Sequence, residues 1–159
     1  MNRLISKLVI TVVLLVISTS TTWAEEHGYK NPQWLYSSTD CITITNVNFT
    51  DSVTILDIHE KHIPTWWVKI DPNTVLIDYN GQEYKLIRGE GVTPGELFIT
   101  PECGYADFKL YFEPMPVNTQ FFDYIEGYKT GDFRILGVHC SDNPIRVPNY
   151  LPKLDIEEF

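Results

Sequence analysis

From about residue 41 onward, apolar and polar residues alternate along much of the chain with the two-residue period of a β-strand. The clearest run is 106–112, where every second side chain is apolar. Other runs are rich in branched and aromatic residues and are bounded by turn-forming residues. We therefore expect about nine short strands, at 41–49, 53–59, 66–70, 74–78, 83–88, 97–100, 106–112, 121–125 and 133–138.

The sequences between these runs are typical of turns. Asn80-Gly81 separates two of them, and this pair suits a type I′ hairpin turn because both central residues need positive φ. No segment of useful length repeats apolar residues at helical spacing. We predict an all-β fold, either an antiparallel sandwich or a barrel. We favour a β-sandwich of Ig-like or jelly-roll-like type, because several strands have one polar face.

The two ends of the chain differ from this middle part. Arg3 and Lys7 precede a short apolar run and small residues that lead to Ala24, which is the layout of a secretory signal peptide. We expect cleavage near Ala24 and a periplasmic or extracellular protein. The predicted organisation is a signal peptide at 1–24, a loose N-terminal arm at 25–40, a sandwich domain at 41–140 and a Pro-rich acidic tail at 141–159.

Composition narrows the range of partners. The chain has 12 basic and 21 acidic residues and a formal net charge of −9, which disfavours binding to nucleic acid or to anionic lipid. We expect no membrane span in the mature chain, because no second apolar run is long enough.

Three cysteines, Cys41, Cys103 and Cys140, leave at least one unpaired. A Cys103–Cys140 disulfide is one option, and the other two pairings remain open. His139 stands next to Cys140, but adjacent strand residues point apart, which disfavours a nucleophile pair there.

Two groups of side chains are candidates for binding. His59 and His62 could reach one metal ion if the chain turns between them, although a polar strand end explains them better. Trp66, Trp67 and Trp34 are candidates for contact with a ligand or partner, because aromatic rings with a polar edge are effective contact residues. Neighbouring strand residues point to opposite faces, so one of Trp66 and Trp67 is expected in the core and the other outside.

Several motifs keep a recognisable order through the middle of the chain. They lie at 67–70, 74–77, 80–84, 89–92, 97–104, 108–116, 122–127 and 133–138. Their order resembles an N-terminal Ig-like β-sandwich region of exported thioredoxin-fold or peroxiredoxin-like proteins of anaerobic Gram-negative gut bacteria. The resemblance implies an exported accessory module. The chain stops soon after Val138, so no thioredoxin domain is expected and the redox activity of such proteins is not carried over.

No catalytic constellation is recognisable in the sequence, so we expect a non-enzymatic module without a cofactor. We expect this exported module to contact a protein of the cell envelope. The alternative is a carbohydrate-binding module that uses exposed Trp and Tyr residues. Asp51-Ser52-Val53 looks like a short O-glycosylation signal of exported proteins of the same bacteria, so Ser52 is a candidate modification site.

Overall fold

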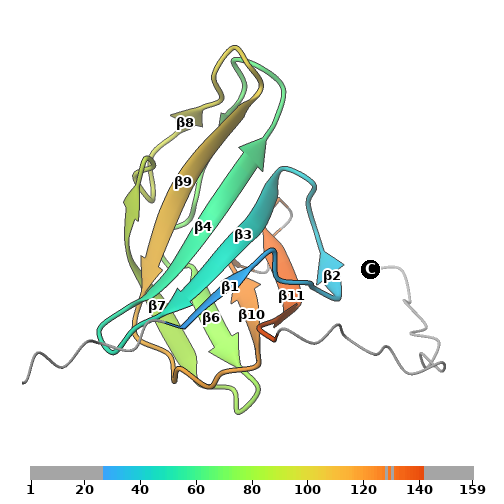
Figure 1. The fold of residues 1–159 in the computed structure, drawn as a ribbon. Helices are drawn as coiled ribbons and strands as arrows, with labels where there is room; N and C mark the ends of the chain where they lie inside the picture. Colours follow the sequence, from blue (N-terminus) through green and yellow to red (C-terminus); the bar gives the residue numbers. More distant parts are fainter. Residues whose placement is uncertain (1–26, 128, 130, 142–159) are drawn as a thin grey trace, which may run out of the picture.

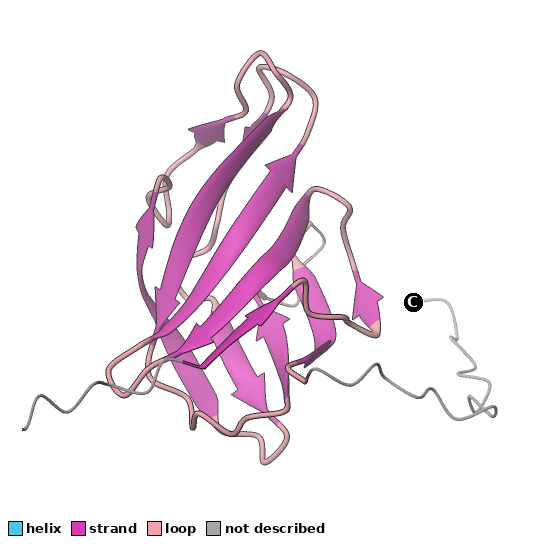
Figure 2. Cartoon of the chain, viewed as in Figure 1, coloured by secondary structure: helices cyan, strands magenta, loops and turns pink. Residues whose placement is uncertain are grey.

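The computed structural model describes residues 27–127, 129 and 131–141, and all regular structure in this part is β-strand (Figure 2). The all-β prediction is therefore confirmed. The predicted signal peptide and nearly all of the predicted tail lie outside the described residues. The strands are β1 (His27–Lys30), β2 (Tyr36–Ser37), β3 (Ile42–Phe49), β4 (Thr54–Lys61), β5 (Trp67–Val68), β6 (Val75–Asp78), β7 (Glu83–Glu90), β8 (Phe98–Ile99), β9 (Tyr105–Phe112), β10 (Phe121–Ile125) and β11 (Arg134–His139).

Nine of these strands form one antiparallel sheet in the order β1-β3-β4-β9-β7-β6-β10-β11-β2, and β5 pairs with β8 in a separate two-stranded sheet. The large sheet curls into a half-barrel (Figure 1). The sheet curls at β7, because the first half of this strand pairs with β6 and its second half pairs with β9. The pairing with β9 has a register shift after Leu86. The strands thus form a continuous curled sheet, and the two separate layers expected of a sandwich do not appear in their pairing.

The concave face of the half-barrel holds the core. Every second side chain is buried along β4, and along β9 from Phe108 onward, as the alternation in the sequence predicts. Phe49, Phe112, Phe122 and Tyr124 are the largest fully buried side chains. Burial of each such ring stabilises the fold by roughly 1.5–3 kcal/mol relative to an exposed ring.

The convex face carries polar side-chain pairs between neighbouring strands. Asp57 on β4 lies 3.4 Å from the ammonium of Lys109 on β9, and His59 Nδ1 lies 2.8 Å from a carboxylate oxygen of Asp107. All four side chains are at least partly exposed, so each pair contributes about 0–1 kcal/mol. These pairs therefore contribute little to the stability of the sheet.

The segment 27–37, which we call the strap, joins the two edges of the half-barrel. Its first part, β1, pairs with β3, and its last part, β2, pairs with β11. Between them the Asn31 N–H donates to the Thr45 carbonyl oxygen (2.8 Å), and Gln33 bridges to His139. The described part of the predicted N-terminal arm is thus an integral part of the sheet, which corrects the expectation of a loose segment.

The Asn80-Gly81 hairpin exists, but the type I′ turn is wrong. Gly81 has φ +79°, whereas Asn80 does not have positive φ. The Gly81 N–H donates to the Asp78 carbonyl oxygen, and the Asp78 carboxylate accepts from the N–H groups of Asn80 and Gln82. Burial acts to raise the pKa of Asp78, but these bonds, with one from the Tyr84 hydroxyl, lower the pKa below its usual value. The Asp78 side chain, rather than positive φ at Asn80, organises this turn.

Candidate functional site

Five large apolar side chains are exposed at the end of the molecule where β5 and β8 pair. We call Ile63, Trp66, Trp67, Leu97 and Ile99 the tip cluster. Each of them is between 51% and 60% exposed. In Figure 1, β8 lies near the end of the half-barrel at which β9 begins and β4 ends. Such a concentration of exposed apolar side chains is a feature of interaction surfaces.

The local chain path explains why these side chains are exposed. In the two-residue ladder of β5 and β8, Trp67 faces Ile99 on the exposed side, whereas Val68 faces Phe98 on the side toward the core. Phe98 in turn packs near the ring of Phe108, with the ring centres 6.0 Å apart. One side of this small sheet is therefore anchored, and the other side is free to make contacts.

The expectation that one of Trp66 and Trp67 lies in the core is wrong, since they are 55% and 57% exposed. The strand begins only at Trp67, and Thr65 has φ +65°. The Trp66 N–H donates to the Ile63 carbonyl oxygen (3.1 Å), which closes a turn before the strand. Because Trp66 belongs to a turn and not to a strand, the strand rule of alternate faces does not apply to this pair.

Next to the tip cluster the fold brings together Cys41 and His62. The Cys41 Sγ lies 3.7 Å from the His62 Nδ1. The ring of Trp66 packs edge-on against the His62 ring, with centres 5.6 Å apart and an interplanar angle of 81°. The Cys41 carbonyl oxygen accepts from the Lys61 N–H (2.8 Å), and the Cys41 N–H donates to Thr39 Oγ1 (2.9 Å). Both partners are thus held in position.

Sequence reasoning missed this pair. Cys41 and His62 are 21 residues apart, and they meet because β3 and β4 pair in the register that sets Ile42 opposite Glu60. The β3–β4 hairpin itself could be expected from the sequence. The register contains a bulge after Ile44, which no motif in the sequence marks.

The two candidate metal ligands face different partners. His59 contacts Asp107 on the convex face, whereas His62 contacts Cys41. Within residues 27–127, 129 and 131–141, no group of three or more His, Cys, Asp or Glu side chains is placed to hold a metal ion. The structure therefore does not bring His59 and His62 together in one site.

The three cysteines are free in the structure, so the Cys103–Cys140 disulfide considered above is not formed. Cys103 is exposed before β9, whereas Cys140 is buried after β11. Burial raises the pKa of the Cys140 thiol to about 12, which keeps it protonated and unreactive. The neighbouring His139 ring instead stacks on Phe121, with ring centres 4.5 Å apart.

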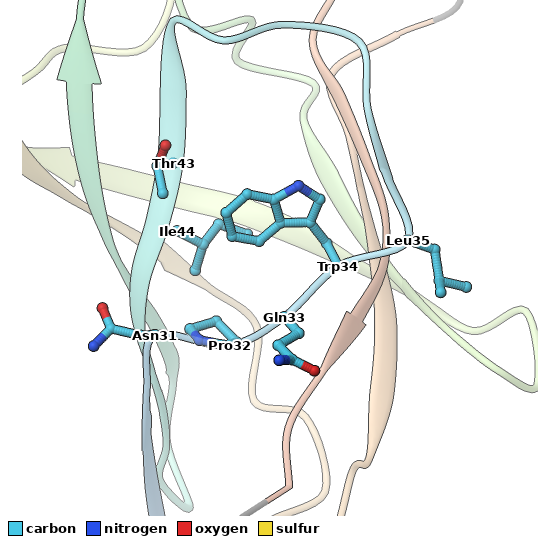
Figure 3. Close-up of a pocket in the computed structure, with 7 residues that line it drawn as sticks. All are labelled: Asn31, Pro32, Gln33, Trp34, Leu35, Thr43 and Ile44. Carbon is cyan, nitrogen blue, oxygen red and sulfur yellow. The ribbon is translucent and has the colours of Figure 1, made fainter. Parts of the chain in front are cut away.

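A pocket of about 600 Å³ opens beside the strap (Figure 3). Figure 3 shows the indole of Trp34 reaching from the strap toward Thr43 and Ile44 on β3, while Leu35 points away. Trp34 is 38% exposed. The lining is completed by Asn31, Pro32 and Gln33. The third candidate tryptophan therefore lies apart from the other two, in a pocket whose lining also includes Asn31, Gln33 and Thr43.

A buried carboxylate marks the junction of three segments elsewhere in the fold. Glu126 follows β10 and is only 8% exposed. Its carboxylate oxygens accept from the N–H groups of Asp71 (2.7 Å) and Phe133 (2.8 Å). Burial raises the pKa of Glu126, although the two N–H donors act to lower it. The satisfied backbone donors identify Glu126 as a structural residue of the junction.

The candidate modification site, Ser52, lies exposed in the turn between β3 and β4. Within the part of the chain that the structure describes, no helix is long and apolar enough to cross a bilayer.

Comparison with protein-family models, with curated proteins and with solved structures found no match to this chain.

Proposed function

We propose that this chain is an exported, non-enzymatic binding module that docks a partner protein through the tip cluster. The observation that carries the proposal is the exposure of two tryptophans among three aliphatic side chains on one small, anchored sheet. Trp is the residue most enriched among the side chains that dominate binding energy at protein interfaces. The side chains that surround a tryptophan at an interface exclude water from its contact with the partner.

The chemistry of the tip cluster favours a protein over a glycan. Ile63, Leu97 and Ile99 offer no hydrogen bonds and no flat ring for a sugar, but they match an apolar groove on another protein. The exposed charged residues beside the cluster in the sequence are of both signs: Lys61 and Lys69, and Glu96 and Glu102. The partner that fits is a protein with an apolar groove and a polar rim.

The resemblance to accessory regions of exported proteins supports the same proposal. It suggests a partner in the cell envelope, which a chain with an N-terminal signal peptide would encounter. It adds no residue to the docking surface, because the shared motifs are mainly packing and turn residues.

Site-specific crosslinking tests the docking surface. A photo-crosslinking amino acid is placed at Leu97, at the edge of the tip cluster, and in a second variant at Tyr79, which is 79% exposed in the β6–β7 turn. We expect one envelope protein to be crosslinked from Leu97 but not from Tyr79 when both variants are produced in the native cells. Its affinity for the purified chain is then measured by calorimetry.

The same partner allows a quantitative control. Trp66→Ala and Trp67→Ala should each weaken binding by about 30-fold or more, the effect of removing a central interface tryptophan. Tyr79→Ala should leave the affinity unchanged. Identical crosslinks from Leu97 and Tyr79, or an affinity that neither tryptophan variant changes, would overturn the proposal.

The strap pocket favours a second candidate function, carbohydrate binding. Its volume of about 600 Å³ is in the range of ligand sites, and an indole beside amide and hydroxyl groups is suited to a sugar ring. A glycan array should then give a hit that Trp34→Ala abolishes and that Trp66→Ala does not change. An array without hits would remove this candidate and leave the docking proposal intact.

A further inference from the structure

The three cysteines of this chain have different surroundings, and only that of Cys41 suggests chemistry. Its Sγ lies 3.7 Å from the His62 Nδ1, and the side chain is partly exposed. The Cys103 thiol contacts the Tyr105 carbonyl oxygen instead (3.2 Å), and Cys140 is buried. A thiol beside an imidazole is the arrangement that activates cysteine as a nucleophile.

We propose that Cys41 is a nucleophilic thiol that reacts with disulfides, with His62 as its proton acceptor. The ligand class is a disulfide, either on a protein docked at the neighbouring tip cluster or in a small molecule. The inference does not depend on docking, because the reactivity belongs to the pair itself. It goes beyond the proposed binding function by adding a covalent site.

The reaction is a thiol–disulfide exchange, in which no external oxidant is required. The His62 Nδ1, in the tautomer that carries its proton on Nε2, accepts the proton of the Cys41 thiol. The thiolate attacks one sulfur of the disulfide, a new bond forms between that sulfur and Cys41 Sγ, and the original S–S bond breaks. The second sulfur leaves as a thiolate and takes the proton back from the imidazolium. Cys41 is oxidised to a mixed disulfide, and the leaving sulfur is reduced to a thiol.

The geometry prepares the pair for this step. The Cys41 backbone is held by hydrogen bonds with Lys61 and Thr39, and the Trp66 ring packs edge-on against the His62 ring. A nucleophile and a base that are both held in place lose little freedom when the reaction begins. Trp66 also belongs to the tip cluster, so a protein bound there would lie beside Cys41.

Thiol labelling of the full chain tests the inference. The probe is dithiodipyridine, a small neutral disulfide, and peptide mass mapping assigns the rate of labelling to each cysteine. Near neutral pH, Cys41 should react about tenfold faster than Cys103, although Cys103 is the more exposed thiol. His62→Gln should slow the labelling of Cys41 by about tenfold and leave the rate at Cys103 unchanged.

Two internal controls keep the result interpretable. His59→Gln removes a histidine of the same hairpin that contacts Asp107, and it should change neither rate. Cys140 reports on the fold, because it becomes reactive only if a variant opens the core. If labelling of Cys140 shows that His62→Gln has opened the core, that variant is set aside. The ratio of the Cys41 and Cys103 labelling rates in the unmodified chain then tests whether Cys41 is the more reactive thiol. Faster labelling of Cys103 than of Cys41, or a Cys41 rate that His62→Gln leaves unchanged in a folded variant, would overturn the inference.

Discussion

At the tip, five large apolar side chains are exposed to solvent, whereas at the junction after β10 the carboxylate of Glu126 is buried beneath two backbone donors. In both regions the side chains are in surroundings opposite to their usual preference: apolar side chains are exposed at the tip, and an acidic side chain is buried at the junction. The tryptophans are 55% and 57% exposed, so they bury less surface than the core rings and are open to contact with another molecule. Buried Glu126 is unavailable to a partner, but it satisfies the N–H groups of two loops. Under the docking proposal, binding and folding therefore depend on different residues.

The largest expected effect lies in the core. Phe112→Ala should lower the free energy of unfolding by about 3–5 kcal/mol, because the ring is fully buried and packs against Tyr124. Urea unfolding followed by circular dichroism measures the change. Tyr79→Ala, at a highly exposed position, should stay within about 0.5 kcal/mol. Equal losses in the two variants would contradict the described core.

The next effect sharpens the role of the junction. Glu126→Ala should lower the free energy of unfolding by about 1–3 kcal/mol, because it leaves the partly buried N–H groups of Asp71 and Phe133 without their acceptor. The exposed Glu102→Ala is the matched control and should change stability by less than about 0.5 kcal/mol. If Glu126→Ala lost partner binding at a temperature where the variant remains folded, the claim that the junction serves folding and the tip serves binding would be contradicted.

A smaller effect is the pH dependence that Glu126 contributes. Burial raises the pKa of Glu126 above its ordinary value of 4.5, and the nearby carboxylates of Asp132 and Asp71 act in the same direction. The folded state therefore binds the proton more tightly than the unfolded state, and this contribution to stability falls as pH rises from the ordinary value through the raised pKa. In unfolding measured across this range, the stability of the unmodified chain relative to Glu126→Gln should decrease with rising pH. An increase would mean that hydrogen bonding outweighs burial.

Strand positions could be predicted from the sequence, because alternation in runs such as 106–112 reflects burial on one face of a sheet. All nine expected strands occur, although β5 and β8 are each only two residues long. Strands β1 and β2 were missed because their side chains are mostly exposed, so they show no alternation. Their positions depend on backbone pairing with β3 and β11, which side-chain patterns do not record.

The candidate site was predicted less completely. Trp66 and Trp67 were identified from their residue type, but their joint exposure depends on the turn at Thr65, whose positive φ no motif predicts. The Cys41–His62 contact depends on a bulged register between two strands. Both features arise from the path of the backbone, and a pattern of residue types describes that path only indirectly.

The most direct test of the separation between binding and folding uses one variant and two measurements. In Trp66→Ala/Trp67→Ala, affinity for the partner crosslinked from Leu97 is measured by calorimetry, and the free energy of unfolding is measured in urea. We predict that affinity falls by about 100-fold or more, while the free energy of unfolding changes by less than about 1 kcal/mol. An unchanged affinity, or a loss of stability comparable to that of Phe112→Ala, would contradict the account.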